Sequence, residues 1–189
     1  MAASLIIPPA VEPVTLQEVK DHLRIVIADD DTILAFTIQS AREHVEDMIS
    51  RALITQTWEL VLNRFPSIID LPYPPLQTVA SIVYIDSDGL QQTLDPSVYA
   101  VDTKNTPGRV RPAYDQSWPA TRKDINTVTI TYTAGYGNAT TDVPGPIRSA
   151  LLLLIGHLYE NREATAPFQI TNLPLGVDRL LAPYRMITF

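Results

Sequence analysis

Residues 131–161, TYTAGYGNATTDVPGPIRSALLLLIGHLYEN, are the stretch of sequence that decides the fold. The stretch begins as a strand rich in β-branched residues, passes through a glycine-containing loop and enters an apolar helix. Apolar residues cover nearly every face of this helix between Ile147 and Leu158. Such a pattern is typical of a helix surrounded by other elements. We therefore predict a buried central helix over residues 144–162.

The glycine-containing loop has some features of a phosphate-binding turn, because glycines let backbone amides approach an anion at a helix N-terminus. The loop lacks the third glycine of the dinucleotide motif and the Gly-Lys-Ser/Thr of the mononucleotide loop. Asp142 adds negative charge, and Pro144 and Pro146 remove two amide donors. The sequence favours a turn followed by a helix start, with both prolines in the first turn.

Two helices are predicted before this stretch. Residues 15–24 begin with Thr15 and carry Glu18 three positions later, the pattern of a capping box. Three aspartates, Asp29 to Asp31, then precede a long amphipathic helix, and we expect the last of them to cap it. Its apolar positions recur at helical spacing: Leu34, Ile38, Ala41, Val45, Met48 or Ile49, and Ala52.

From Thr55 onward the sequence alternates polar and apolar residues and is rich in β-branched and aromatic side chains, which predicts strands. Asp88-Gly89 lies between two such runs and indicates a tight hairpin turn. Frequent prolines confine strand pairing to short pieces. We expect a small antiparallel sheet inserted between the helices.

The predicted fold class is α+β. It consists of a small helical bundle, made of the long amphipathic helix and the central buried helix, with an inserted antiparallel β-sheet and an extended C-terminal arm. We expect a single domain over residues 1–189. Its parts are N-terminal helices at 12–53, the β region at 54–134, the central helix at 144–162 and the arm at 163–189.

Composition limits the function. The net charge is −7, from 14 Lys and Arg against 21 Asp and Glu, so the surface on average repels phosphate backbones. The absence of cysteine excludes a disulfide framework, a Cys-ligated zinc and a thiol nucleophile. The longest apolar run, residues 150–155, is far shorter than a bilayer span requires, so we expect no membrane association.

No residue pattern announces catalysis, and we expect no catalytic residues, cofactor or metal. Asp29-Asp30-Asp31 could supply oxygen ligands to a divalent cation, but such runs are more often solvated turns. The histidines, His22, His44 and His157, lie on separate predicted helices without zinc-ligand spacing.

A small basic cluster leaves an alternative function open. Its cations could form a stacking platform for single-stranded nucleic acid, since aromatic residues are interleaved with them. In an acidic protein they could equally pair with carboxylates. A small-molecule-binding domain is the other alternative. The residues concerned are Arg109, Arg111, Arg122, Lys123, Tyr114 and Trp118.

The order and spacing of seven segments resemble those of a known family. These segments are EPVTLQEVKDHLRI, AREHVEDMISRALITQTWEL, PPLQTVASIVYIDSDG, the Trp118-Pro119 pair, VTITYTAGYG, VPGPIRSALLLLIGHLYENRE and LPLGVDRLLAPYR. Together they resemble the head-tail connector (adaptor) proteins of tailed bacteriophages, and the resemblance extends from Glu12 to Arg185. Each segment alone is short and structural.

The resemblance implies a structural virion protein without enzymatic activity. It implies a ring of roughly a dozen copies below the portal protein, in the neck of the particle. The next neck protein, a stopper or tail-completion protein, would dock beneath, and DNA would pass through the lumen during ejection without sequence-specific binding. The expected locations are the virion neck and, during assembly, the host cytoplasm.

Two contact regions follow as expectations. The polar face of the long helix could pair with a neighbouring subunit or remain solvated; its residues are Arg42, Glu43, Glu46, Asp47 and Arg51. In related connectors the C-terminal part contributes to portal docking, and this carries over only as a region, residues 168–189. Folding back onto the protein's own core is the alternative. The candidate docking residues are Phe168, Ile170, Leu173, Leu175, Leu180, Leu181, Tyr184 and Arg185.

Overall fold

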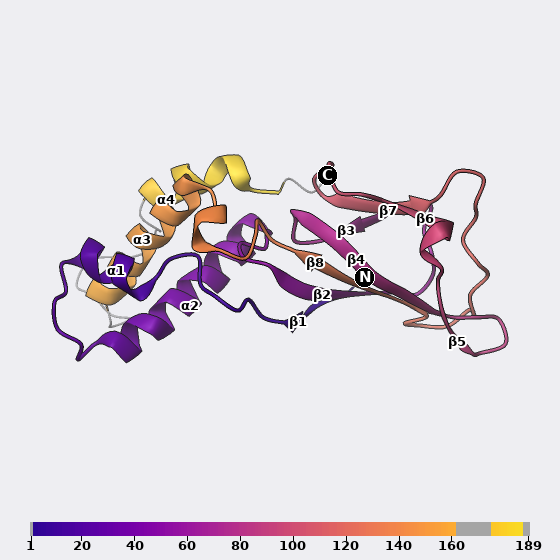
Figure 1. Ribbon diagram of the computed structural model, residues 1–189, viewed down its shortest axis with the longest axis horizontal. Coiled ribbons are helices and arrows are strands. Elements are labelled where there is room, and N and C mark those ends of the chain that lie inside the picture. The colour runs from indigo at the N-terminus through magenta and orange to yellow at the C-terminus, as the bar shows by residue number, and fades with distance from the viewer. Residues whose placement is uncertain (1, 162–174, 187–189) are drawn as a thin grey trace. The chain divides into compact units, whose positions relative to one another are not determined.

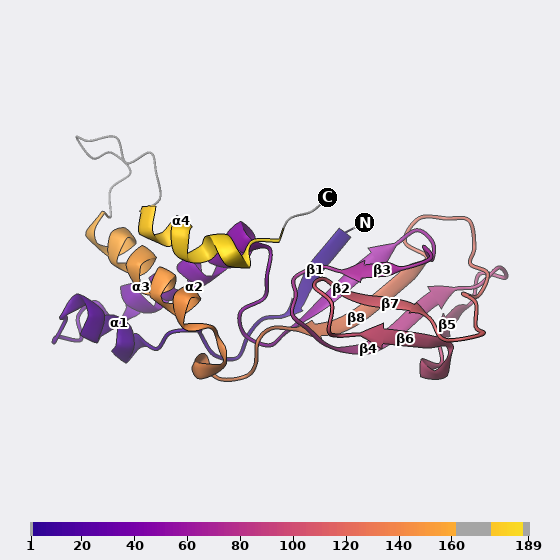
Figure 2. The same cartoon turned by 90° about the horizontal axis from the view of Figure 1, so that it is seen from above.

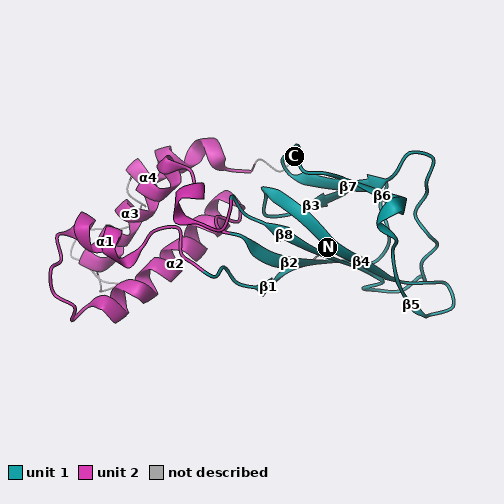
Figure 3. Cartoon of the chain, in the orientation of Figure 1, with its two compact units in different colours: residues 1–10, 55–136 teal, residues 11–54, 137–189 magenta. Residues whose placement is uncertain are grey.

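The computed structural model describes residues 2–161 and 175–186 (Figures 1 and 2). The chain forms two compact units, each built from two separate stretches of sequence (Figure 3). Unit 1 comprises residues 1–10 and 55–136, and unit 2 comprises residues 11–54 and 137–189. The sequence predicted a single domain with an inserted β region at 54–134.

Unit 2 begins with helix α1, Leu16–Leu23, whose start confirms the predicted capping box. The Glu18 amide donates to the Thr15 hydroxyl (3.2 Å), and the Thr15 amide donates to the Glu18 carboxylate (2.8 Å). The hydrogen bond from the Thr15 amide is the main cause of the lowered pKa of Glu18, and Arg148 lowers this pKa further. The pair fixes where the first helix starts.

Helix α2 spans Asp31–Ile49 and buries the predicted stripe. It ends earlier than expected, because Ser50 adopts a left-handed conformation with φ 54°, so Ala52 is buried beyond the helix end. The expected cap by Asp31 is wrong. Asp30 occupies the cap position without a side-chain capping bond, while Asp31 pairs with Lys20 at 2.7 Å.

Helix α3 spans Gly145–Glu160 and contacts both α2 and α4, the latter spanning Leu175–Leu181. The expectation that α3 is covered on every face is wrong, since Leu153 is 41% exposed and Leu158 is also exposed. Its buried side chains are Ile147, Ala150, Leu151, Leu154 and Ile155. The helix is therefore buried along one broad face only.

Unit 1 contains two antiparallel sheets where the sequence predicted one. The first has strand order β1-β2-β8-β4-β5, and the second has order β3-β7-β6. Alternate residues of β2 and β8 are buried, as the period of the sequence predicts. The strands are β1 Ala2–Ile7, β2 Gln56–Leu62, β3 Ile69–Leu71, β4 Leu76–Ile85, β5 Gln91–Thr93, β6 Tyr99–Asp102, β7 Gly108–Pro112 and β8 Val128–Ala134.

The contact between β7 and β4 depends on a glycine. A Cβ atom added at Gly108 would lie 2.4 Å from the Cβ of Leu76, so only glycine allows this approach. At the other end of β4, Gly89 has φ 87°, which confirms the predicted turn between β4 and β5. Short 3-10 helices also lie at Pro96–Val98, Thr140–Asp142 and Ala182–Tyr184.

Candidate assembly surfaces

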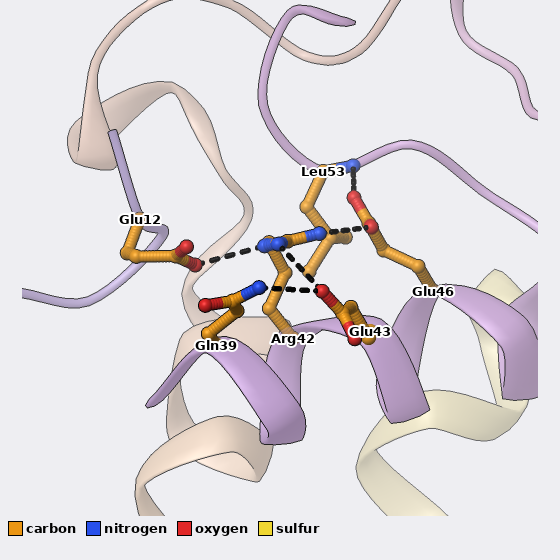
Figure 4. A network of polar contacts seen from close by, with 6 residues as sticks. All are labelled: Glu12, Gln39, Arg42, Glu43, Glu46 and Leu53. Carbon is orange, nitrogen blue, oxygen red and sulfur yellow. Dashed lines mark hydrogen bonds and ion pairs between the residues drawn. The ribbon is translucent and has the colours of Figure 1, made fainter. Parts of the chain in front are cut away.

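A buried network of charged groups joins α2 to the segments on either side of it (Figure 4). Arg42, only 3% exposed, donates to Glu12 at 2.8 Å and to Glu46 at 2.9 Å. Glu46 is 6% exposed and also accepts the backbone amide of Leu53 at 2.8 Å. Both carboxylates act to raise the pKa of Arg42 against the opposing effect of its burial. The network fixes the chain before and after α2 to the helix.

This network corrects the predicted subunit contact face. Arg42 and Glu46 are both buried in unit 2, where they form an ion pair with each other. They are therefore not available to pair with a neighbouring subunit. The Arg51 side chain also turns inward and donates to the carbonyl of Tyr184. Of the five residues, Glu43 and Asp47 have exposed side chains. The predicted pairing with a neighbouring subunit stays a proposal for these two.

The end of the chain folds back onto unit 2 over the part that the structure describes. Leu181 is fully buried, and the Met186 amide donates to the carbonyl of Ile49 at 3.1 Å. The extended arm and the exposed docking role expected for Leu181 are therefore wrong there. Burying this leucine against the core removes apolar surface from water.

The other candidate docking residues differ in how exposed they are and in whether the structure describes them. Leu180 and Tyr184 are half-buried, and Arg185 is exposed and pairs with Asp178 at 2.7 Å. For Leu175 the structure describes the backbone within α4. Three candidates lie outside the described residues: Phe168, Ile170 and Leu173.

The loop after β8 is held by internal hydrogen bonds. The Gly135 amide donates to the carbonyl of Pro75 at 2.9 Å, and the Ala139 amide donates to the Asp142 carboxylate at 2.9 Å. A carboxylate therefore already lies where a bound phosphate would need amide donors. The loop is a turn, as the sequence predicted.

Replacing Gly137 with alanine should destabilise unit 2. A Cβ atom there would lie 2.1 Å from the Oδ2 atom of Asp142, so the carboxylate that caps the loop must move. We expect the free energy of unfolding to fall by about 1–3 kcal/mol, as for other overpacked sites. Gly145→Ala is the matched control, because nothing lies within 4 Å of its added Cβ. Equal denaturant midpoints for both variants would contradict this role of Gly137.

The basic cluster lies in unit 1 and is partly neutralised. Arg109 pairs with Asp70 at 3.0 Å and lines an open hollow of about 510 Å³ with Arg111 and Lys104. Trp118 stacks on Phe65 with ring centroids 4.7 Å apart. Its indole face is thus already in contact within the chain, which weakens the case for a base-stacking platform.

Acidic residues and histidines do not converge in the described part of the chain. Within residues 2–161 and 175–186, no group of three or more His, Cys, Asp or Glu side chains is placed to hold a metal ion. The hydrogen bond from the Gln92 side chain lowers the pKa of Asp86, as do the hydrogen bonds that its carboxylate accepts from the amides of Leu90 and Asp88 in the hairpin turn. None of the described helices is long and apolar enough to cross a membrane.

Sequence reasoning missed two features of these surfaces. Arg42 also pairs with Glu12, and Glu46 also accepts the Leu53 amide, whereas only the spacing of Arg42 and Glu46 within α2 was visible beforehand. It also missed that Phe36 is 70% exposed on α2. The sequence signal for this exposure was the position of Phe36, which does not fall in the predicted buried stripe of the helix.

Comparison with known proteins finds a family model that matches part of the chain. Residues 13–92 match the model of a family described as phage gp6-like head-tail connector protein. This match confirms the family resemblance predicted from the sequence. A comparison with curated proteins finds no match.

Three solved structures contain chains with the same fold. A chain of the "Neck of empty GTA particle computed with C6 symmetry" has TM-score 0.80 and 24% identity, covering 100% of this chain and 97% of that chain. A chain of the "Virion of native gene transfer agent (GTA) particle" has TM-score 0.82 and 22% identity, with the same coverage. A chain of the "Neck of native GTA particle computed with C12 symmetry" has TM-score 0.76 and 23% identity, again with that coverage.

Proposed function

We propose that this chain, which matches the model of the phage head-tail connector family over residues 13–92, is a structural component of the neck of a phage-like particle. It forms a ring of roughly a dozen copies below the portal protein, in which heterologous contacts between neighbouring copies close on themselves. A stopper or tail-completion protein docks beneath the ring, and DNA passes through its lumen. The protein acts without catalysis, in the virion neck and, during assembly, in the host cytoplasm.

The observation that carries this proposal is the likeness of the whole chain to chains of particle necks. The likeness covers 100% of this chain and 97% of the compared chains. The C6 and C12 symmetries named for those necks support a ring as the form of assembly. Both units of this chain take part in the likeness.

The charge of the protein supports passage of DNA. With a net charge of −7, the surface on average repels phosphates. A channel wall that attracted the phosphate backbone would bind DNA and slow its ejection. An acidic subunit is therefore suited to a conduit.

The portal contact is proposed for the C-terminal segment, residues 168–189. Within the described part, Leu180, Tyr184 and Arg185 remain at least partly accessible beside the buried Leu181. The half-buried aromatic ring and the adjacent arginine are residue types that are enriched in interface centres. The prediction from the sequence also includes Leu175 of α4 and, outside the described residues, Phe168, Ile170 and Leu173.

Sedimentation velocity tests the proposed function. The purified protein is measured alone and after mixing with the portal protein encoded in the same genome. We expect a large complex that contains both proteins, with the mass of a ring added to the portal. A protein that stays monomeric at all concentrations and never sediments with the portal would contradict the proposal.

A further inference from the structure

Helix α2 presents an exposed stripe that combines apolar and acidic side chains. Phe36, Glu43 and Asp47 recur at helical spacing on the side opposite the buried stripe. Phe36 is 70% exposed, and Ile33, one turn before it, is exposed as well. We call these four residues the acidic face. Aromatic side chains are enriched in protein interfaces, so Phe36 with Ile33 is the candidate apolar part of a contact, and the two carboxylates follow it along the same side of the helix.

A second exposed surface of unit 2 has the complementary character. Leu153 of α3 is exposed, and its Cδ1 atom would lie 3.6 Å from a Cβ placed on Gly176 of α4. Gly176 and Arg179 are both exposed and lie on one side of α4. The neighbouring Asp178 pairs with Arg185. We call Leu153, Gly176 and Arg179 the basic face.

The two faces look outward from different sides of unit 2. Helix α3 contacts both α2 and α4 (Figures 1 and 2). The buried stripe of α2 faces the core, so the acidic face points away from it. Val177 is fully buried in α4, so Arg179 points away from the core as well. Each subunit therefore carries two different exposed surfaces, and a heterologous ring needs two different surfaces on every subunit.

We propose that the acidic face of one copy binds the basic face of the next copy, so that unit 2 supplies the contact that closes the ring. This inference rests on the proposed function. Pairing of like faces would bring Glu43 and Asp47 against the same carboxylates of a second copy, and this repulsion disfavours a symmetric dimer. In this contact Phe36 becomes buried between the two copies. The opposite charges around it attract the two faces and fix how they align.

Charge reversal tests this contact in the full-length protein. One variant carries Glu43→Arg with Asp47→Arg, and a second carries Arg179→Glu. Each places like charges across the proposed contact, so we expect each alone to assemble at least about tenfold more weakly than wild type. Mixed in equal amounts, the two variants should assemble again, because each reversed face then meets the opposite charge on its neighbour.

Further variants keep the test decisive. Phe36→Ala should weaken assembly without lowering the melting temperature, since the side chain is exposed. Lys123→Glu reverses an exposed charge in unit 1 and should assemble as wild type does. Circular dichroism melts establish that each variant is folded. If one reversed variant does not fold, the other and Phe36→Ala decide the outcome.

The outcomes separate this inference from the function on which it rests. Assembly is followed by sedimentation velocity, with and without the portal protein. If the wild type joins the portal and the folded variants do so equally well, the subunit contact lies elsewhere and the connector function stands. A mixture that fails to recover assembly also overturns the contact. If the wild type itself never assembles, the proposed function fails and the inference fails with it.

Discussion

Replacing Glu46 with alanine is expected to lower the free energy of unfolding by about 3–5 kcal/mol, because it removes one partner of a buried ion pair. Arg42, itself 3% exposed, would keep Glu12 but lose the carboxylate that it meets at 2.9 Å. The backbone amide of Leu53 would also lose its acceptor. Chemical denaturation, followed by circular dichroism, measures the change.

Two variants identify the cause of that loss. Glu43→Ala removes an exposed carboxylate from the same helix and should change the free energy of unfolding by less than about 1 kcal/mol. Glu46→Gln keeps an acceptor for the Leu53 amide and should lie between Glu46→Ala and wild type. If Glu46→Ala were as stable as Glu43→Ala, the network would not hold α2 to its neighbouring segments.

Replacing Leu154 with aspartate is expected to prevent unit 2 from folding. Leu154 lies on the buried face of α3, and an aspartate there would place an unpaired charge in the core. The cost, several kcal/mol for an isolated buried ion, is comparable to the whole stability of a domain. Hydrogen exchange of the amides in α3 and the helical signal in circular dichroism measure the loss.

The neighbouring residue provides the control. Leu153 is 41% exposed, so Leu153→Asp should leave the cooperative melt near that of wild type. The same variant should still weaken subunit assembly, since Leu153 belongs to the basic face. A cooperative melt near wild type for Leu154→Asp would show that α3 is not the centre of the unit 2 core.

Local sequence patterns were sufficient to predict the helices. The Thr15 and Glu18 pair predicted the start of α1, and the apolar spacing predicted the buried stripe of α2. Both signals act within a few residues, so they can be read without tertiary structure. The early end of α2 could not be predicted, because a left-handed serine at position 50 carries no strong sequence signal.

Long-range contacts account for most of what the sequence missed. Strand β1 pairs with β2, which lies about fifty residues later, and a short apolar run before two prolines does not indicate such a partner. The burial of Arg42 likewise depends on Glu12, which comes from outside the helix. The polar face was therefore predicted from helical spacing alone, and two of its members turned out to belong to the core.

The C-terminal segment shows the same limit. Its apolar residues were recognised, but an apolar segment can bind its own core or a partner, and composition does not distinguish the two. The structure places Val177 and Leu181 in the core of unit 2. The residues of this segment that stay accessible remain the proposed portal contact.

Electron microscopy of this protein bound to the portal protein from the same genome tests the central claim most directly. The measurement is the density added to the portal along its axis, averaged without imposed symmetry. The account predicts an added ring with an open lumen on one face of the portal, in which unit 2 of each copy contacts the next copy. Portal particles without added density, or with single copies that do not touch one another, would contradict it.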